Sequence, residues 1–147
     1  MISLDSASAE GGDGETQKMV HLKIYGQCPS KKSSQQIIVN KKTKRAMLIP
    51  NKKYNEWIHS TVKQLKDQKE EKQFETINEP VAVKCFVYRL TKRKIDLINL
   101  LQSIHDALEA AGIIKDDFLI ESTDGSRRIL GVEKGEERAE IFISSFY

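Results

Sequence analysis

Four aspartates on or beside one helical stretch are the residues of this chain whose types and spacing suit catalysis. Asp96 precedes the stretch, Asp106 lies within it, and Asp116 and Asp117 follow it after a glycine at position 112. Carboxylate oxygens are the ligands that hard divalent cations such as Mg²⁺ prefer. A cation held near a phosphodiester activates water and stabilises the charge that develops on phosphorus. The simpler interpretation is a helix N-cap followed by an acidic turn, and on pattern alone it is the commoner one.

The helix that must position these carboxylates is expected from Leu97 to about Ala111. Apolar residues recur along its buried side at helical spacing, namely Leu97, Leu100, Leu101, Ile104, Leu108 and Ala111. An adjacent polar stripe steps by 3, 4 and 3 residues through Asp96, Asn99, Ser103 and Asp106. Gly112 is the residue expected to end the helix.

Apolar segments elsewhere predict a mixed sheet. The expected strands are 20–26, 37–39, 46–49, 81–90, 118–122, 128–130 and 138–143. The segment 81–90 is apolar on both faces, which predicts a central strand. The basic residues 40–45 predict a hairpin turn, and Asp124-Gly125 predicts a second turn that joins 118–122 to 128–130.

A second helix is expected after Asn51, which can cap it. Its core-facing stripe is Tyr54, Trp57, Ile58, Val62 and Leu65, and the polar residues 66–79 are expected to fray into a surface loop. The fold class is therefore α+β, a mixed sheet with two main helices in the order roughly β-β-β-α-β-α-β-β. Residues 1–18 are expected to form a disordered tail, and 19–147 one domain.

The composition agrees with one soluble domain. The chain has 147 residues, enough for one hydrophobic core. No apolar run approaches the roughly 18 residues of a membrane span, and no secretory signal is visible, so we expect a cytoplasmic location without membrane contact. Cys28 and Cys85 form no CxxC pair and do not cluster with the histidines, which argues against structural zinc.

The charge is unevenly distributed along the chain. Between Thr16 and Asn55 there are ten lysines and arginines and no acidic residue, whereas acids outnumber bases from Lys115 to Glu140. This division favours a protein that grips phosphates with one part and holds a cation with the other. The candidate DNA-binding residues lie in loops and turns: Lys31, Lys32, Lys41, Lys42, Lys44, Arg45, Lys92, Arg93 and Lys94. The alternative is an ordinary solvated basic surface.

The order and spacing of these motifs resemble the RusA family of Holliday-junction resolvases. The family pattern D-x-D-N-x-x-K, D-A-L, G and D-D matches Asp96 to Asn99, Asp106-Ala107-Leu108, Gly112 and Asp116-Asp117 without a gap. Two further stretches resemble one branch of the family, Pro29 to Ser34 and Asp124 to Arg127 followed by Arg138 to Ile141. The resemblance extends from about residue 20 to 146.

The resemblance implies a homodimer that binds four-way DNA junctions and makes paired Mg²⁺-dependent nicks, as bacterial and phage members do. It implies catalytic and metal-binding roles for Asp96, Asp116 and Asp117, with Mg²⁺ or Mn²⁺ as the cofactor. The second catalytic carboxylate of the pattern falls on Ile98 and its lysine on Gln102. The chain thus resembles a branch that lacks this second aspartate. Candidate substitutes for the missing carboxylate are Asp106, Asp124 and Glu140.

Three functions remain open from the sequence. The first is a metal-dependent endonuclease acting on branched DNA, and the second is a junction-binding protein of the same fold that has lost cleavage. The third is a basic nucleic-acid-binding domain unrelated to resolvases, in which the aspartates are surface residues. The chain contains no Walker or Rossmann glycine pattern, and no hydroxyl nucleophile with a histidine and an acid is evident.

Overall fold

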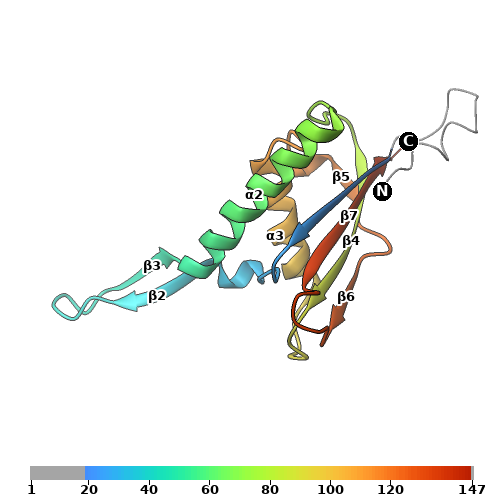
Figure 1. Ribbon diagram of the computed structural model, residues 1–147. Helices are drawn as coiled ribbons and strands as arrows, with labels where there is room; N and C mark the ends of the chain where they lie inside the picture. Colours follow the sequence, from blue (N-terminus) through green and yellow to red (C-terminus); the bar gives the residue numbers. More distant parts are fainter. Residues whose placement is uncertain (1–18, 147) are drawn as a thin grey trace, which may run out of the picture.

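The computed structural model describes residues 19–146, so the tail expected over residues 1–18 lies outside the described residues. A five-stranded mixed sheet forms one layer, and two helices, α2 (Lys52–Lys72) and α3 (Leu97–Ala110), cover one of its faces (Figure 1). No helix covers the other face within the described residues. The α+β class, with one mixed sheet and two main helices, is confirmed.

The strand order places β4 at the centre, as its apolar sequence predicts. The order is β1 (Met19–Tyr25), β7 (Arg138–Ser145), β4 (Val81–Arg89) and β5 (Ile120–Ser122), and β6 (Arg127–Leu130) also pairs with β4. β7 runs antiparallel to both β1 and β4, whereas β5 and β6 run parallel to β4. The chain thus has three strands after α3, one more than the expected order counts.

The core lies between the sheet and the two helices. Leu100, Ile104 and Leu108 of α3 are fully buried, together with Val83 of β4 and Ile141 of β7. Alternate residues of β4 and β7 point into this core and the others point to the helix-free face. No helix of the described residues is long and apolar enough to cross a membrane.

The expected fraying of the first helix after Leu65 is wrong, because α2 continues to Lys72. Gln68 on this extension and Gln64 just before it bond to the main chain of β1. The Gln68 side chain accepts a hydrogen bond from the Lys23 amide at 2.9 Å and donates one to the Lys23 carbonyl, and Gln64 does the same with Tyr25. These contacts fix the polar part of the helix on the sheet.

The hairpin expected around Asp124-Gly125 is also wrong. β5 and β6 do not pair with each other; each pairs with β4 instead. The first half of the expected strand 118–122 is a 3-10 turn, η2 (Asp117–Leu119), since the Asp116 side chain accepts a hydrogen bond from the Phe118 amide and bends the chain there.

The basic hairpin is present and projects from the body as an arm. β2 (Gln35–Val39) and β3 (Ala46–Pro50) pair antiparallel and form a separate two-stranded sheet (Figure 1). Apolar side chains on the arm are open to solvent, with Ile37 68% and Leu48 63% exposed. At its base, the Asn51 amide donates a hydrogen bond to the Ser34 carbonyl, in a short 3-10 turn, η1 (Lys31–Ser34).

Candidate active site

Helix α3 positions the aspartates that the sequence singles out. Its N-cap is Asp96, whose side chain accepts a hydrogen bond from the Ile98 amide at 3.1 Å. At the other end Gly112 takes a left-handed conformation with φ of 73°, and its amide donates to the Glu109 carbonyl. The chain then turns back, and the Lys115 amide bonds to the Ile77 carbonyl. This return brings Asp116 and Asp117 beside the C-terminal part of α3.

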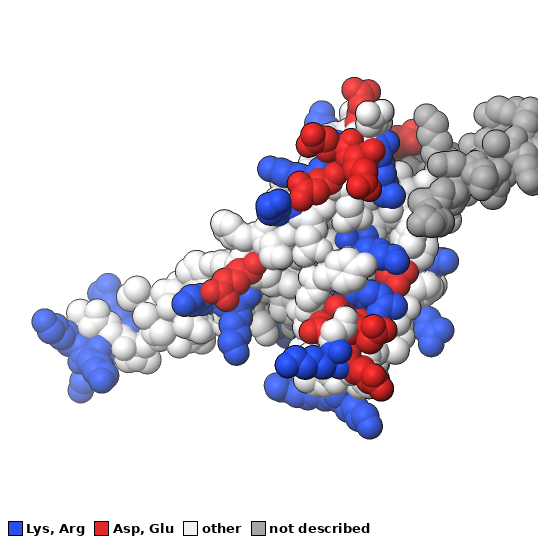
Figure 2. Space-filling view, in the orientation of Figure 1, with Lys and Arg blue, Asp and Glu red and all other residues white. Residues whose placement is uncertain are grey.

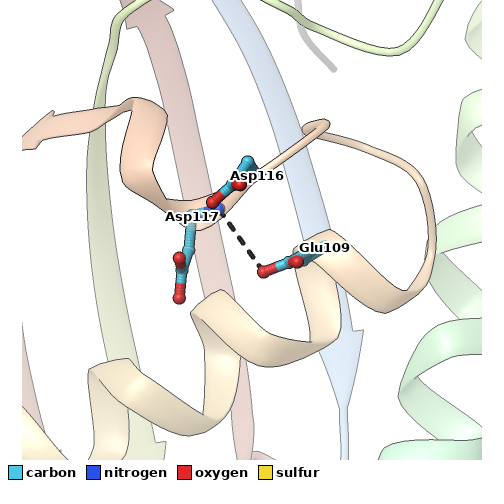
Figure 3. Close-up of side chains that lie close together, drawn as sticks. All are labelled: Glu109, Asp116 and Asp117. Atoms are coloured by element: carbon cyan, nitrogen blue, oxygen red, sulfur yellow. Dashed lines mark hydrogen bonds between the residues drawn. The ribbon is translucent and has the colours of Figure 1, made fainter.

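Three carboxylates meet at this end of α3 (Figure 3). Glu109, Asp116 and Asp117 each offer a carboxylate oxygen, and these oxygens lie within 4.8 Å of one another. The Asp117 amide also donates a hydrogen bond to Glu109 at 3.4 Å. All three side chains are exposed, and none forms a salt bridge within residues 19–146. We call this group the carboxylate cluster.

The donor set of the carboxylate cluster suits a hard divalent cation. Its ligands are all carboxylate oxygens, which Mg²⁺ and Mn²⁺ accept, and their mutual repulsion is relieved when a cation binds. His105 lies on α3 near this cluster. Burial lowers the pKa of His105, and the carboxylates of Asp117 and Asp106 act in the opposite direction.

Glu109 is the member of the cluster that the sequence analysis missed. It shares one face of α3 with Ile98 and Gln102, since it follows them by 11 and 7 residues, which are close to whole turns. Ile98 and Gln102 are the positions at which the resemblance places a carboxylate and a lysine, and both are exposed. The spacing from these two positions was the available signal for Glu109.

Asp96 does not join the carboxylate cluster within one chain. It lies thirteen residues before Glu109 on the same helix, which corresponds to about 20 Å at the helical rise of ~1.5 Å per residue. Instead, Asp96 lines a cavity of about 700 Å³ at the N-terminal end of α3. Its predicted role as a metal ligand stays a prediction.

The candidate substitutes for the missing carboxylate lie elsewhere. Asp106 pairs with Lys31 at 2.6 Å, and this hydrogen bond raises the pKa of the lysine. Glu140 lies on the helix-free face of the sheet, where Arg138 donates to it at 2.9 Å. Asp124 is exposed in the turn after β5. None of the three joins the cluster, so the pairing of Asp106 with Lys31 fits a structural contact between α3 and η1 better than a ligand.

The predicted DNA-binding cations fall into two groups. Lys41, Lys42, Lys44 and Arg45 form the free end of the arm, where Figure 2 shows a blue cluster. Lys32, Arg93 and Lys94 line the cavity beside Asp96. The Lys92 side chain packs against the turn at Gly131. It lies so close that a Cβ added to this glycine would be 2.9 Å from it. Lys31 also lies outside both groups, and Asp106 neutralises it.

The fold and the carboxylate cluster together define a small α+β protein with three grouped carboxylates and exposed basic segments. Comparison with known families identifies it more closely. Residues 27–144 match the family of endodeoxyribonuclease RusA, and the chain belongs to this family. The family consists of divalent-metal-dependent nucleases that act on branched DNA such as Holliday junctions. Comparison with curated proteins gave no match.

Proposed function

We propose that the protein is a Mg²⁺-dependent endodeoxyribonuclease that resolves Holliday junctions and other branched DNA in recombination and repair, with Mn²⁺ as an alternative cation. The carboxylate cluster is the observation that carries the proposal, because a chain of this family gathers Glu109, Asp116 and Asp117 within 4.8 Å. Asp116 and Asp117, the expected pair, supply two of the three carboxylates, and Glu109 supplies the third.

In this proposal each group has a distinct task. Glu109, Asp116 and Asp117 hold the cation, which when bound supplies a Lewis acid for the phosphodiester. The cations of the arm and of the segment 92–94 hold the DNA backbone by charge, which fixes the position of the strand to be cut. Asp96 keeps its proposed catalytic role, which requires a second copy or a rearrangement to bring it to the cluster.

We also propose a homodimer, located in the cytoplasm of a bacterium or of a phage-infected cell. A four-way junction has approximate two-fold symmetry, and two symmetric nicks need two equivalent sites. A two-fold dimer supplies them with one kind of chain. Light scattering is expected to give twice the mass of the chain at micromolar concentration; a monomer both free and on DNA contradicts this part of the proposal.

Cleavage of a synthetic four-way junction tests the central claim. Wild-type protein is expected to nick the junction in Mg²⁺ or Mn²⁺ and to be inactive in a chelator. Asp117→Asn is expected to lose cleavage while it still binds the junction, because the cations that hold the backbone are unchanged. Glu121→Gln, which removes an exposed carboxylate on β5, is the matched control and should cut normally.

The second candidate function is junction binding without cleavage. The observation that favours it is Ile98, which is 66% exposed at the position where the family pattern has a carboxylate. An isoleucine side chain has no atom that can ligate a metal. If wild-type protein binds junctions tightly and never cuts them in either cation, the nuclease proposal fails and this second function replaces it.

A further inference from the structure

The cavity at the N-terminal end of α3 has the chemistry of an anion site and is separate from the carboxylate cluster. Its volume is about 700 Å³. Five cationic residues line it: Lys32, Lys53, Arg89, Arg93 and Lys94. Asp96 is the single acidic residue among the described residues that line it, and its carboxylate already caps α3. The balance of charge at this cavity is therefore strongly positive.

Arg89 is a buried charge without a counter-ion. Its side chain leaves the end of β4 toward the core, and the residue is only 9% exposed. The Nε atom donates to the Cys28 carbonyl at 3.0 Å and Nη1 donates to the Thr91 hydroxyl at 3.5 Å, yet no carboxylate lies within salt-bridge distance in residues 19–146. Burial raises the pKa of the neighbouring Cys28 thiol, which therefore supplies no negative charge. A buried, unpaired guanidinium is costly, and an anionic ligand removes that cost.

A buried donor in the cavity wall lacks an acceptor. Trp57 lines the cavity and is 9% exposed. Its indole Nε1 is enclosed and has no hydrogen-bond partner within the described residues. An indole N–H can only donate, so this group stays unsatisfied until an oxygen acceptor reaches it.

Two helices also begin at this cavity. Asn51, the N-cap of α2, and Asp96, the N-cap of α3, both line it. The N-terminus of a helix carries partial positive charge and free amide donors, which favours phosphate groups. The helix ends therefore act in the same direction as the arginines and lysines.

We propose that this cavity binds a nucleoside phosphate, and specifically one nucleotide of the DNA that is unstacked at the branch point. A volume of about 700 Å³ exceeds the needs of a lone phosphate and suits a group of nucleotide size. A branch point offers such a group at low cost, since unstacking is least costly where a base is already poorly paired. The phosphate meets Arg89 and the rim cations Arg93 and Lys94. That the nucleotide belongs to DNA rests on the proposed function. That the cavity binds an anion is independent of it.

Trp57 reports on the cavity directly because it is the one tryptophan of the chain. Titration with each deoxynucleoside 5′-monophosphate is expected to change its fluorescence saturably, whereas the nucleosides without phosphate leave it unchanged. The double variant Arg93→Gln, Lys94→Gln alters exposed side chains and should fold normally; it is expected to weaken binding by about tenfold or more. Arg89→Gln is expected to abolish the signal, and Lys134→Gln, in the loop before β7, is the matched control.

A junction with 2-aminopurine at the branch point tests the DNA source. The protein carries Asp117→Asn, so binding is measured without cleavage. The fluorescence of 2-aminopurine is expected to rise on binding and to stay low when Arg93→Gln and Lys94→Gln are added. A junction that binds without this rise contradicts the unstacked nucleotide, even if mononucleotides bind. Failure of both fluorescence signals overturns the anion site as well.

The two proposals fail separately. If the wild-type protein never cuts junctions but both fluorescence signals appear, the nucleotide site stands and the nuclease function falls. If the wild-type protein cuts junctions and neither signal appears, the nuclease function stands and the nucleotide site falls. Thermal unfolding of each variant shows whether it is folded before any loss of signal is interpreted.

Discussion

At the scale of single residues, the carboxylate cluster places three negative charges close together without a neutralising side chain among the described residues. Glu109, Asp116 and Asp117 are exposed, so water screens part of their repulsion. A divalent cation that binds only the folded chain would stabilise it by about 2.7 kcal/mol at roughly 100 times its Kd. Cation binding is therefore measurable as a shift of the melting temperature without any DNA.

We expect Glu109→Gln to remove most of the rise in melting temperature that Mg²⁺ or Mn²⁺ produces. The variant keeps the size of the side chain and removes one of three charged ligands. Without added cation it should be as stable as the wild type or slightly more stable, since one repulsive charge is gone. Glu121→Gln, on β5, is the control. An equal shift in wild type and Glu109→Gln would show that Glu109 is not a ligand.

A second residue-scale prediction concerns acid stability and His21. This histidine stacks on Phe142 on the helix-free face of the sheet, with ring centroids 4.2 Å apart. Burial lowers the pKa of His21, and the contact with Glu140 opposes that shift only in part. The folded state thus prefers the neutral imidazole. Its contribution to stability is complete above the ordinary pKa of 6.5 and is lost as the pH falls through the lowered value.

We expect His21→Phe to flatten the decline in stability between pH 7 and pH 5. Denaturant unfolding at several pH values measures this decline. Glu140 has a lowered pKa, so its protonation reduces the free energy of unfolding only at more acidic pH, below 4.5. His59→Gln, which removes an exposed histidine of α2, is the matched control. A profile of His21→Phe that is as steep as that of the wild type would contradict the assignment.

The sequence predicts individual candidate residues better than it predicts which of them lie together in the folded chain. Asp116 and Asp117 stand out as a pair after a glycine, and they do form part of the cluster. Glu109 does not stand out, because a glutamate on an exposed helix face is ordinary. Its position matters only because residues 111–117 turn back along α3. That return depends on Ile114, which is fully buried and bridges to Ile77, and such a long-range contact leaves no local pattern.

At the scale of elements, helix α3 positions Asp96 at its N-terminus and the carboxylate cluster at its C-terminal end. Asp96 has a structural task there, because it accepts the Ile98 amide at the helix start. Asparagine caps a helix about as well as aspartate does, whereas alanine cannot. The two substitutions therefore separate the cap from any role that needs a negative charge.

We expect Asp96→Asn to keep the stability of the wild type and Asp96→Ala to lose about 1 kcal/mol. Denaturant unfolding measures both values. If Asp96 is also catalytic, both variants lose junction cleavage, because neither retains the charge. Cleavage by Asp96→Asn at the wild-type rate would restrict Asp96 to its role as a cap.

The elements that the sequence predicts correctly are those with strong local signals. The stripe of α3, the apolar run of β4 and the basic turn of the arm all appear in the structure. The Asp124-Gly125 turn does not identify which strand its neighbours pair with. β5 and β6 continue in one direction along β4 and each pairs with it in parallel, so the turn between them makes no hairpin. The sequence did not predict the full length of α2. Gln64 and Gln68 hold this part of the helix by hydrogen bonds to β1, which lies about 40 residues earlier in the chain.

At the scale of the whole molecule, two groups of basic residues lie apart from the carboxylate cluster. One group lies at the cavity at the N-terminal end of α3, and the other lies at the free end of the arm (Figure 2). A two-stranded ribbon is narrow enough to enter the major groove of DNA. An arm that extends from the body lengthens the reach of the protein along one DNA branch while the cluster stays near the strand to be cut.

We expect removal of the four tip charges, by glutamine at Lys41, Lys42, Lys44 and Arg45, to weaken junction binding and to lower its salt dependence. Each phosphate contact adds roughly 0.9 to the slope of log K against log salt, so loss of four contacts lowers the slope by about 3 to 4 per arm. The matched control replaces four lysines of the body, Lys63, Lys66, Lys72 and Lys134. It changes the net charge by the same amount, so it separates contact from overall charge. If the control lowers the slope equally, the arm contributes net charge alone and does not touch the DNA.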